Sequence, residues 1–451
     1  MELLSPAGNE EKLAYAYLYG ADAAYIGLGG FSLRARADNF AFDESVEKES
    51  AEKKVPEPEA AEPEQRGLAD RLKALKGEKK LYGAFNIFFH NSHAAAIEEE
   101  METLKTLPLD GCIVSDIGAF SLLRRHMPKI RFHLSTQANC LNSEAVKAYR
   151  DLGFSRIILG RELTLGEIEK IRGDVPDIEL EAFVHGAMCL AYSGRCYLSS
   201  YLTGRSANTG DCTHSCRWNY RVLEEKERPG EFFPVEENDG FTTILSSKDL
   251  NMFDHVGDLK NAGIDSIKIE GRMKSLYYTA VVTRAYRRAV DFAEPEACRE
   301  AGREVPGEEE LSLHREELEN VSHREYSTGF YFGRRDADET TEGSYRRRYE
   351  FLGTIGEKRK HPGETTDNSS GLLHNSQLYR LEVRNSIGSG EALEFIGPDS
   401  TAVEDKDFRL YGGDGTEIEK ANRGPHNSFI GPSVPVKTGY IIRRKRETET
   451  P

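Results

Sequence analysis

The N-terminal part of the chain alternates between short apolar segments and segments with the spacing of amphipathic helices. Stretches such as SEAVKAYRDLG and LGEIEKIRG place apolar residues three and four positions apart, which is the period of a helix. Apolar segments of strand length lie at 2–8, 23–27, 81–89, 111–116, 131–137, 156–162, 179–186 and 265–271. Eight strands separated by helices are typical of a closed parallel sheet. The pattern therefore predicts an α/β fold with a TIM-barrel-like domain.

Polar residues stand at or just beyond the ends of these predicted strands. They are Asn86, Asp116, Gln137, Arg161, Glu162, His185, Glu270 and Arg272. In a βα barrel the carboxyl ends of the strands meet at one mouth, where active sites lie. Some of these polar residues would instead cap helices or bind backbone groups, without a role at the mouth.

A long excursion, residues 187–262, separates the seventh and eighth predicted strands. Its later part, RWNYRVLEE followed by FTTILSSKDL, alternates in a way that suggests a hairpin lying over the barrel mouth. An excursion of this length is usually functional or disordered, and its aromatic residues and cysteines favour a function.

The character of the sequence changes after residue 335. YEFLGTIGE, QLYRLEVRNSIGSGEALEFIG and GYIIRRKRE are rich in strand formers and are separated by turn residues. We therefore expect a TIM-barrel-like domain over 1–335 and a small C-terminal antiparallel β-barrel over 340–446. Residues 44–66, rich in Glu, Ala and Pro, read as a solvated insertion into the first domain.

The net charge of −16 argues against broad, nonspecific binding to nucleic acid. Two basic clusters, RRR at 346–348 and RRKR at 443–446, could meet phosphates or simply form a soluble surface. The sequence shows neither a secretory signal pattern nor an apolar run long enough for a membrane span. We therefore expect a cytoplasmic protein, in which thiols stay reduced.

Four of the seven cysteines fall within the excursion, with gaps of six, fifteen and three residues. They are Cys189, Cys196, Cys212 and Cys216. A zinc ribbon would normally show two tight pairs. Four thiolates can also hold an iron–sulfur cluster, and redox-active or buried thiols remain a third reading. Spacing alone leaves the three alternatives open.

The sequence contains little evidence for the common hydrolase motifs. The twelve histidines form no HExxH, and no GxSxG nucleophile elbow occurs. Cys189 with His185 is conceivable as a nucleophile and its base, although such pairs arise often by chance.

Several longer segments resemble the family long labelled U32 peptidases. They are LLSPAGNEEKL, GADAAYIG, FSLRARADNF, HLSTQAN, ELEAFVHGAMCLAYSGRCYLSSYLTGR, GDCTHSCRW and SIKIEGRMKSLYY. The resemblance runs from residue 2 to about 335, and the tail is similar to the C-terminal domain of that family. Within the family, the sequence is most similar to the tRNA 5-hydroxyuridine synthesis branch.

The resemblance implies an activity that differs from the family label. Several branches are oxygen-independent hydroxylation proteins with a 4Fe-4S cluster on four cysteines, and the tRNA branch hydroxylates the wobble uridine and depends on prephenate. Carried onto this chain, the metal ligands are Cys189, Cys196, Cys212 and Cys216. The quinone branch has its fourth ligand elsewhere, so the Cys212-x3-Cys216 pair favours RNA. The Thr-His-Ser between these two cysteines departs from the usual Gln-Pro pair.

Prephenate is a dicarboxylate and would need cationic partners, for which bidentate arginine is suited. The candidates for substrate binding are Arg34, Arg161, Lys268 and Arg272, and those for proton transfer are Glu181, His185 and Glu270. Each of them could instead belong to a structural ion pair.

The leading hypothesis is therefore an iron–sulfur enzyme that hydroxylates tRNA, with prephenate as co-substrate and an electron donor or partner protein. The alternatives are a collagenase-like peptidase and a zinc-stapled RNA-binding module without catalysis. The oxygen donor, the choice between tRNA and ribosomal RNA, and the oligomeric state do not follow from the residues.

Overall fold

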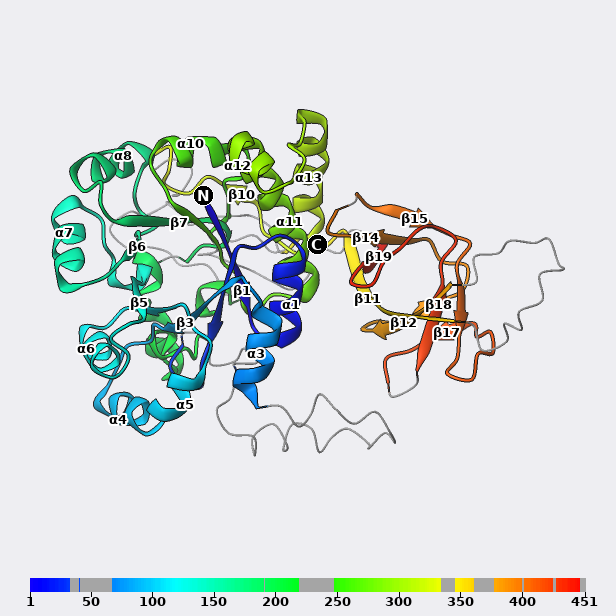
Figure 1. Cartoon of the computed structure of the whole chain (residues 1–451), viewed down its shortest axis with the longest axis horizontal. Helices are drawn as coiled ribbons and strands as arrows, with labels where there is room; N and C mark the ends of the chain where they lie inside the picture. Colours follow the sequence, from blue (N-terminus) through cyan, green and yellow to red (C-terminus); the bar gives the residue numbers. More distant parts are fainter. Residues whose placement is uncertain are drawn as a thin grey trace, which may run out of the picture. The chain divides into compact units, whose positions relative to one another are not determined.

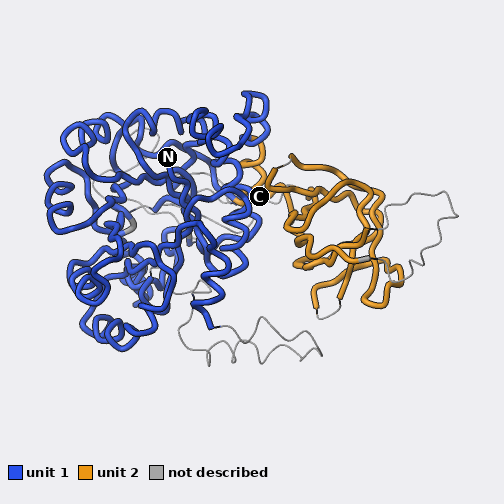
Figure 2. Tube along the Cα trace, viewed as in Figure 1, with its two compact units in different colours: residues 1–48, 62–315, 323–345 blue, residues 49–61, 316–322, 346–451 orange. Residues whose placement is uncertain are grey.

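The computed structural model describes residues 1–32, 40, 67–189, 191–218, 247–333, 345–360, 377–399, 401–424 and 427–446. Arg34, the acidic insertion 44–66 and most of the predicted hairpin lie outside these residues. The described residues fall into two compact units (Figure 2). One contains the residues up to Arg315 together with His323–Tyr345, and the other contains Glu316–Ser322 and the residues from Arg346 onwards.

Eight parallel strands form a closed barrel in the first unit, as the sequence predicts (Figure 1). They are β1 (Glu2–Ala7), β2 (Ala23–Gly27), β3 (Lys80–Phe85), β4 (Gly111–Val114), β5 (Arg131–Leu134), β6 (Arg156–Ile158), β7 (Glu179–Ala187) and β9 (Ser266–Ile269). Each pairs with the next in chain order, and β9 closes the barrel by pairing with both β7 and β1. The strands are almost wholly buried because helices cover their outer face.

Helices surround the barrel (Figure 1). They are α1 (Glu10–Leu18), α3 (Leu68–Lys76), α4 (Asn91–Glu99), α5 (Met101–Thr106), α6 (Ile117–His126), α7 (Ser143–Leu152), α8 (Leu165–Asp174), α10 (Val256–Asn261) and α11 (Leu276–Ala293). Side-chain caps set where several of them begin, because an oxygen at the N-cap satisfies an otherwise unpaired amide. Asp116, one of the polar strand-end residues, is such a cap, since its side chain accepts from the amide of Ala119 at 2.9 Å. Thr164 and Glu167 form a capping box on α8.

Two short strands extend the sheet beyond the barrel. β8 (Asp249–Asn251) runs antiparallel to the end of β7, and β10 (Tyr326–Ser327) pairs with β8. A buried ion pair joins the two additions, because Arg324 Nη2 lies 2.6 Å from Asp249 Oδ1. Between α11 and β10 the chain forms α12 (Pro295–Glu300) and α13 (Glu308–Asn320).

The second unit is an antiparallel half-barrel sheet. Its strands are β11 (Tyr349–Lys360), β12 (Gln377–Val383), β14 (Leu393–Ile396), β15 (Val403–Asp405), β16 (Arg409–Tyr411), β18 (Ser428–Gly431) and β19 (Ile441–Lys445), and β13 (Ile387–Gly388) pairs separately with β17 (Lys420–Ala421). Leu352, Phe395 and Ile442 are among the apolar residues of its core. The sequence-based fold class is therefore confirmed for both units.

Two residues of the second basic cluster, Arg443 and Arg444, pair with carboxylates of the same unit. Arg443, 1% exposed, binds Glu317 at 2.6 Å and Glu394 at 2.7 Å. Arg444 binds Glu350 at 2.6 Å. These two guanidinium groups therefore stabilise the sheet, and the buried Arg443 fits neither a phosphate contact nor a soluble surface. In the described part of the chain, no helix is both long enough and apolar enough to cross a membrane.

Candidate active site at the barrel mouth

Arg161 and Glu270 come together at the carboxyl ends of β6 and β9. Arg161 Nη2 lies 3.6 Å from Glu270 Oε2, and the guanidinium stacks 3.9 Å from the ring centroid of Phe183. Arg161 Nη1 donates to the carbonyl of Ala187 at 3.1 Å. Its buried Nε has no hydrogen-bond partner among the described residues. A long ion pair and a vacant donor leave this arginine able to bind an anionic group.

Glu181 and Lys268 lie deeper inside the barrel and bind each other. Lys268 Nζ is 3.2 Å from Glu181 Oε1 and 4.4 Å from the ring centroid of Tyr25. Burial lowers the pKa of Lys268, and the charge of Glu181 opposes this shift. Glu181 also binds Arg156 at 3.0 Å. The structure thus gives both candidates an ion-pair partner inside the barrel.

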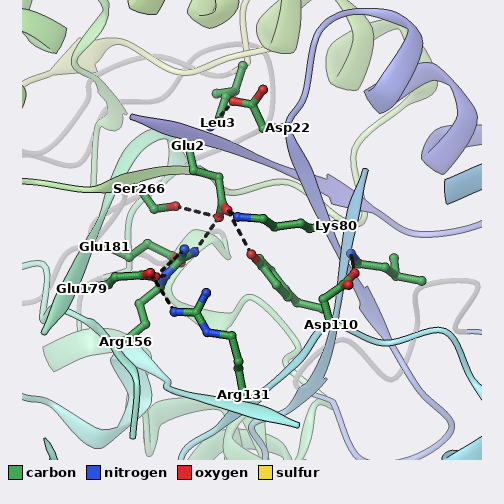
Figure 3. A network of polar contacts seen from close by, with 12 residues as sticks. Glu2, Leu3, Asp22, Lys80, Asp110, Arg131, Arg156, Glu179, Glu181 and Ser266 are labelled. Atoms are coloured by element: carbon green, nitrogen blue, oxygen red, sulfur yellow. Dashed lines mark hydrogen bonds and ion pairs between the residues drawn. The ribbon is translucent and has the colours of Figure 1, made fainter. Parts of the chain in front are cut away.

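A network of charges continues from Glu181 to the amino ends of the strands (Figure 3). Arg156, 2% exposed, binds Glu2 at 2.5 Å and Glu179 at 2.8 Å. Glu2 also accepts from Lys80 at 2.8 Å. Burial alone would raise the pKa of Glu2, but hydrogen bonds and charges from Arg156 and Lys80 lower it to about 2. In a βα barrel this end serves stability rather than catalysis.

His185 faces away from the mouth, into an aromatic cluster between β7, α11 and β10. Its Nδ1 lies 3.3 Å from the hydroxyl of Tyr286 and its Nε2 lies 3.5 Å from that of Tyr326. Burial lowers the pKa of His185 to about 3, so the ring is neutral. Both ring nitrogens therefore face tyrosine hydroxyls, and neither is directed at a cysteine.

Arg272 lies in the turn between β9 and α11, which approaches the loop after β1 closely. Arg272 is 3% exposed, and its carbonyl accepts from Lys12 Nζ at 3.5 Å. A Cβ on Gly8 would come within 2.4 Å of that carbonyl. A glycine at this position therefore lets the two loops touch at the mouth. Arg34 lies outside the described residues.

The first part of the excursion is fastened to three loops of the mouth. Next to Cys196, the Ser193 hydroxyl lies 2.8 Å from Glu162 Oε2, beyond β6. Arg195 Nε donates to the carbonyl of Gln137, beyond β5, at 2.7 Å. The amide of Phe88, beyond β3, donates to the carbonyl of Asn208 at 2.9 Å. These bonds place the cysteine-bearing segment over the mouth.

Internal hydrogen bonds hold the segment together. The Asn208 side chain bonds to the backbone of Cys196 twice, at 3.1 Å to its amide and 3.0 Å to its carbonyl. Ser199 Oγ accepts from the amide of Thr213 at 3.1 Å, which links α9 (Leu198–Thr203) to the loop of Cys212. Ser193 has φ of 44°, in the left-handed region. For a residue other than glycine, this backbone conformation destabilises the fold by on the order of 1–3 kcal/mol. Ser193, Ser199 and Asn208 could not be singled out from the sequence, because serine and asparagine are common in any loop.

The four clustered cysteines are free thiols of differing accessibility. Cys189 is exposed, and Cys196, Cys212 and Cys216 are partly buried. The amide of His214 donates to Cys212 Sγ at 3.4 Å. Four such thiols are a donor set suited to iron–sulfur or zinc. In the described residues, however, no three Cys, His, Asp or Glu side chains are gathered closely enough to hold a metal ion.

The remaining cysteines are part of the packing. Cys112, Cys140 and Cys298 are buried, and burial raises the pKa of Cys112 and Cys140 to about 12. These two thiols are therefore protonated and unsuited to bind metal.

The fold and the site define a TIM-barrel protein with a cysteine-bearing segment over its mouth. Residues 8–54 and 67–341 match the model of peptidase family U32, and residues 347–443 match the model of the peptidase family U32 C-terminal domain. The chain belongs to peptidase family U32.

Relatives in this family carry names that refer to RNA. The chain is 36% identical to tRNA hydroxylation protein P of Escherichia coli, over 88% of this chain and 86% of that one. It is 34% identical to tRNA hydroxylation protein P1 of Bacillus subtilis, over 93% and 89%. It is also 35% identical to the 23S rRNA 5-hydroxycytidine C2501 synthase of Escherichia coli, over 64% of this chain and 39% of that one.

Proposed function

We propose that this chain is an RNA-modifying enzyme that hydroxylates the wobble uridine of tRNA to 5-hydroxyuridine. The observation that carries the proposal is the similarity to proteins named for tRNA hydroxylation over nearly the whole chain, including the cysteine-bearing segment. The location of that segment agrees with it, because it is fastened over the mouth of a barrel.

A 4Fe-4S cluster on Cys189, Cys196, Cys212 and Cys216 is the cofactor that we propose. When bound, such a cluster supplies or accepts single electrons. The donor set suits it, but the four thiols must move closer together than they are in the described conformation. The exposed Cys189 follows directly after Met188. The Met188 carbonyl accepts from the Ser247 hydroxyl at 2.7 Å, so the backbone just before Cys189 is anchored.

We propose that Arg161 binds the co-substrate, prephenate. A carboxylate reaching the mouth would meet the vacant Nε of Arg161 and could displace Glu270 from its 3.6 Å contact. Glu270 would then be the carboxylate nearest to the reacting molecules and able to carry a proton. Lys268 and Glu181, bound to each other below, would keep the barrel interior neutral.

The peptidase alternative has less support from the geometry. A cysteine nucleophile needs a base within hydrogen-bond reach. His185, the histidine nearest in sequence to Cys189, is neutral and faces Tyr286 and Tyr326.

The proposal is tested by purifying the protein without oxygen and measuring iron, acid-labile sulfide and zinc, followed by mass spectrometry of tRNA nucleosides. We expect about four irons and four sulfides per chain. Cys196→Ser should lose them, together with 5-hydroxyuridine in cells that depend on this chain. Cys298→Ser, which changes a buried thiol in α12, is the matched control and should keep both.

Other outcomes contradict the proposal in distinct ways. Stoichiometric zinc without sulfide would indicate a structural staple. Cleavage of gelatin that Cys189→Ala abolishes, with unchanged tRNA, would indicate a peptidase. Hydroxylated ribosomal RNA in place of tRNA would correct the substrate alone.

A further inference from the structure

The cysteine-bearing segment exposes four large aromatic side chains. Tyr192 is 68% exposed, Tyr197 and Tyr201 are each 73% exposed, and Trp218 is 40% exposed. Aromatic rings left in water add nothing to the stability of the fold, and a concentration of them marks a surface that binds something. All four lie within 27 residues of the sequence of this 451-residue chain.

Three of these rings contact other parts of the segment. Tyr197 and Tyr201 are four residues apart, and their ring centroids are 6.3 Å from each other at an angle of 42°. Trp218 Nε1 donates to the carbonyl of Thr213 at 3.1 Å, and Thr213 is itself bonded to Ser199 of α9. Rings that already contact their neighbours lose less entropy when they bind.

The charge of the segment differs from that of the rest of the molecule. Residues 187–218 contain three arginines and one aspartate, whereas the whole chain has a net charge of −16. The aspartate, Asp211, is already bound to Arg205 at 2.7 Å. The exposed Arg195 is fixed by Gln137, and its guanidinium lies 5.9 Å from the ring centroid of Phe88.

We propose that Tyr192, Tyr197, Tyr201 and Trp218, with Arg195, form an aromatic platform that stacks the unpaired bases of a single-stranded RNA loop. Every base has a face on which an aromatic ring can stack, and arginine meets the neighbouring phosphates. The acidic remainder of the chain disfavours general binding along a duplex. This inference rests on the proposed function and names the surface that receives its substrate.

The location of the platform fits this role. Ser193, which follows Tyr192, is bonded to Glu162, and Asn208 is bonded to Phe88, so the segment lies beside the barrel mouth. A base that reacts at the mouth must leave its stack, and the bases on either side then need a surface that replaces their lost neighbours.

The experiment uses Trp218, the only tryptophan of the chain, as its reporter. The full-length protein is titrated at low salt with an RNA hairpin carrying an open loop of seven nucleotides, and separately with a blunt duplex of the same stem. We expect the hairpin to quench the fluorescence of Trp218 and to bind at least tenfold more tightly than the duplex. Equal quenching by both RNAs would overturn the proposal.

Substitutions separate the rings from their surroundings. The double variant Tyr197→Ala, Tyr201→Ala should bind the hairpin about tenfold or more weakly, as expected when stacking partners are removed. The double variant Tyr197→Phe, Tyr201→Phe should keep most of the affinity, because the rings remain. Phe292→Ala is the control. This ring is 41% exposed and lies in the last turn of α11, at the end of the helix that is far from the mouth.

The outcomes distinguish this inference from the proposed function. If tRNA is hydroxylated and the alanine variant binds the hairpin like the parent protein, the aromatic platform is contradicted and the proposed function is supported. If the hairpin binds through the tyrosines but no nucleoside changes, the function fails and the platform stands. Quenching that depends on protein concentration without RNA would show that the platform joins two copies of the chain, which would also overturn the proposal.

Discussion

Buried arginines in the barrel differ in how completely their partners satisfy them. Arg156 is surrounded by the carboxylates of Glu2, Glu179 and Glu181, at distances of 2.5 to 3.0 Å. Arg161 has one carboxylate at 3.6 Å and a buried Nε without a partner among the described residues. A complete set of acceptors stabilises the folded chain, whereas an incomplete set leaves room for a ligand to supply the missing acceptor.

Glu2 should make the stability of the barrel depend on pH. Its pKa falls from an ordinary 4.5 to about 2 in the folded state, so its contribution is fully present above 4.5 and is lost as the pH falls toward 2. This shift corresponds to about 3 kcal/mol. Glu2→Gln should therefore lower the free energy of unfolding at pH 7 by an amount of that order, and the difference should shrink below pH 4.5.

Urea unfolding measured between pH 7 and pH 3 tests this prediction. The control is Glu102→Gln, which removes an exposed carboxylate that pairs with Lys105 on the surface. It should change stability little at any of these pH values. A difference between the parent protein and Glu2→Gln that stays constant across the range would show that Glu2 titrates normally.

Among the elements, the turn between β9 and α11 is confined by glycines on two sides. A Cβ on Gly8 would meet the carbonyl of Arg272 at 2.4 Å, and a Cβ on Gly186 would meet that of Glu270 at 2.5 Å. Gly186 also has φ of 108°, a conformation that other residues rarely adopt. The backbone that carries both mouth residues is thus set by contact with β1 and β7.

Gly186→Ala should destabilise the barrel and displace Glu270. Left-handed backbone and a collision with a carbonyl together should cost more than 1 kcal/mol. The change is measured as a lower thermal midpoint and, if the proposed function is right, as a loss of hydroxylation. Gly166→Ala, on the exposed side of α8 with nothing within 4 Å of the new Cβ, should stabilise slightly instead. Equal effects of the two substitutions would contradict the role of the close contacts.

At the scale of the whole molecule, the two units have separate cores and can be followed by different signals. The single tryptophan, Trp218, belongs to the first unit, whereas the circular dichroism of the chain reports on both. In the second unit the buried Arg443 depends on Glu317, which α13 supplies.

Glu317→Ala should therefore unfold the second unit more easily without affecting the first. Leaving the buried guanidinium with Glu394 alone should cost about 1–3 kcal/mol. We expect the unfolding curve from circular dichroism to acquire an earlier transition while the curve from Trp218 fluorescence stays in place. Lys437→Ala, which removes an exposed partner of Asp399, serves as the control. A common shift of both signals would mean that the units unfold together.

The barrel could be predicted from the sequence because its strands are buried on both faces and read as apolar runs. All eight predicted segments overlap a barrel strand. The antiparallel sheet was predictable for a similar reason, since turn residues separate its strands.

The site was less predictable, because polar residues inside a barrel look alike in sequence whether they pair or bind. Glu181 and Lys268 gave no sign that they bind each other. His185 shows the limit most clearly. Strict alternation from Glu181 and Phe183 would point it inward, but the pairing of β7 with β9 shifts register between Phe183 and His185 and turns the ring outward. A bulge of this kind leaves no signal in a single sequence.

The direct pairing of β7 with β9 has a consequence for how such proteins diversify. The closure of the barrel is made by Glu181–His185 and Ser266–Ile269, and residues 191–218 of the joining segment contribute no strand to it. Changes in residues 191–218 can therefore bring other metal ligands or other rings to the same mouth while the barrel strands stay the same.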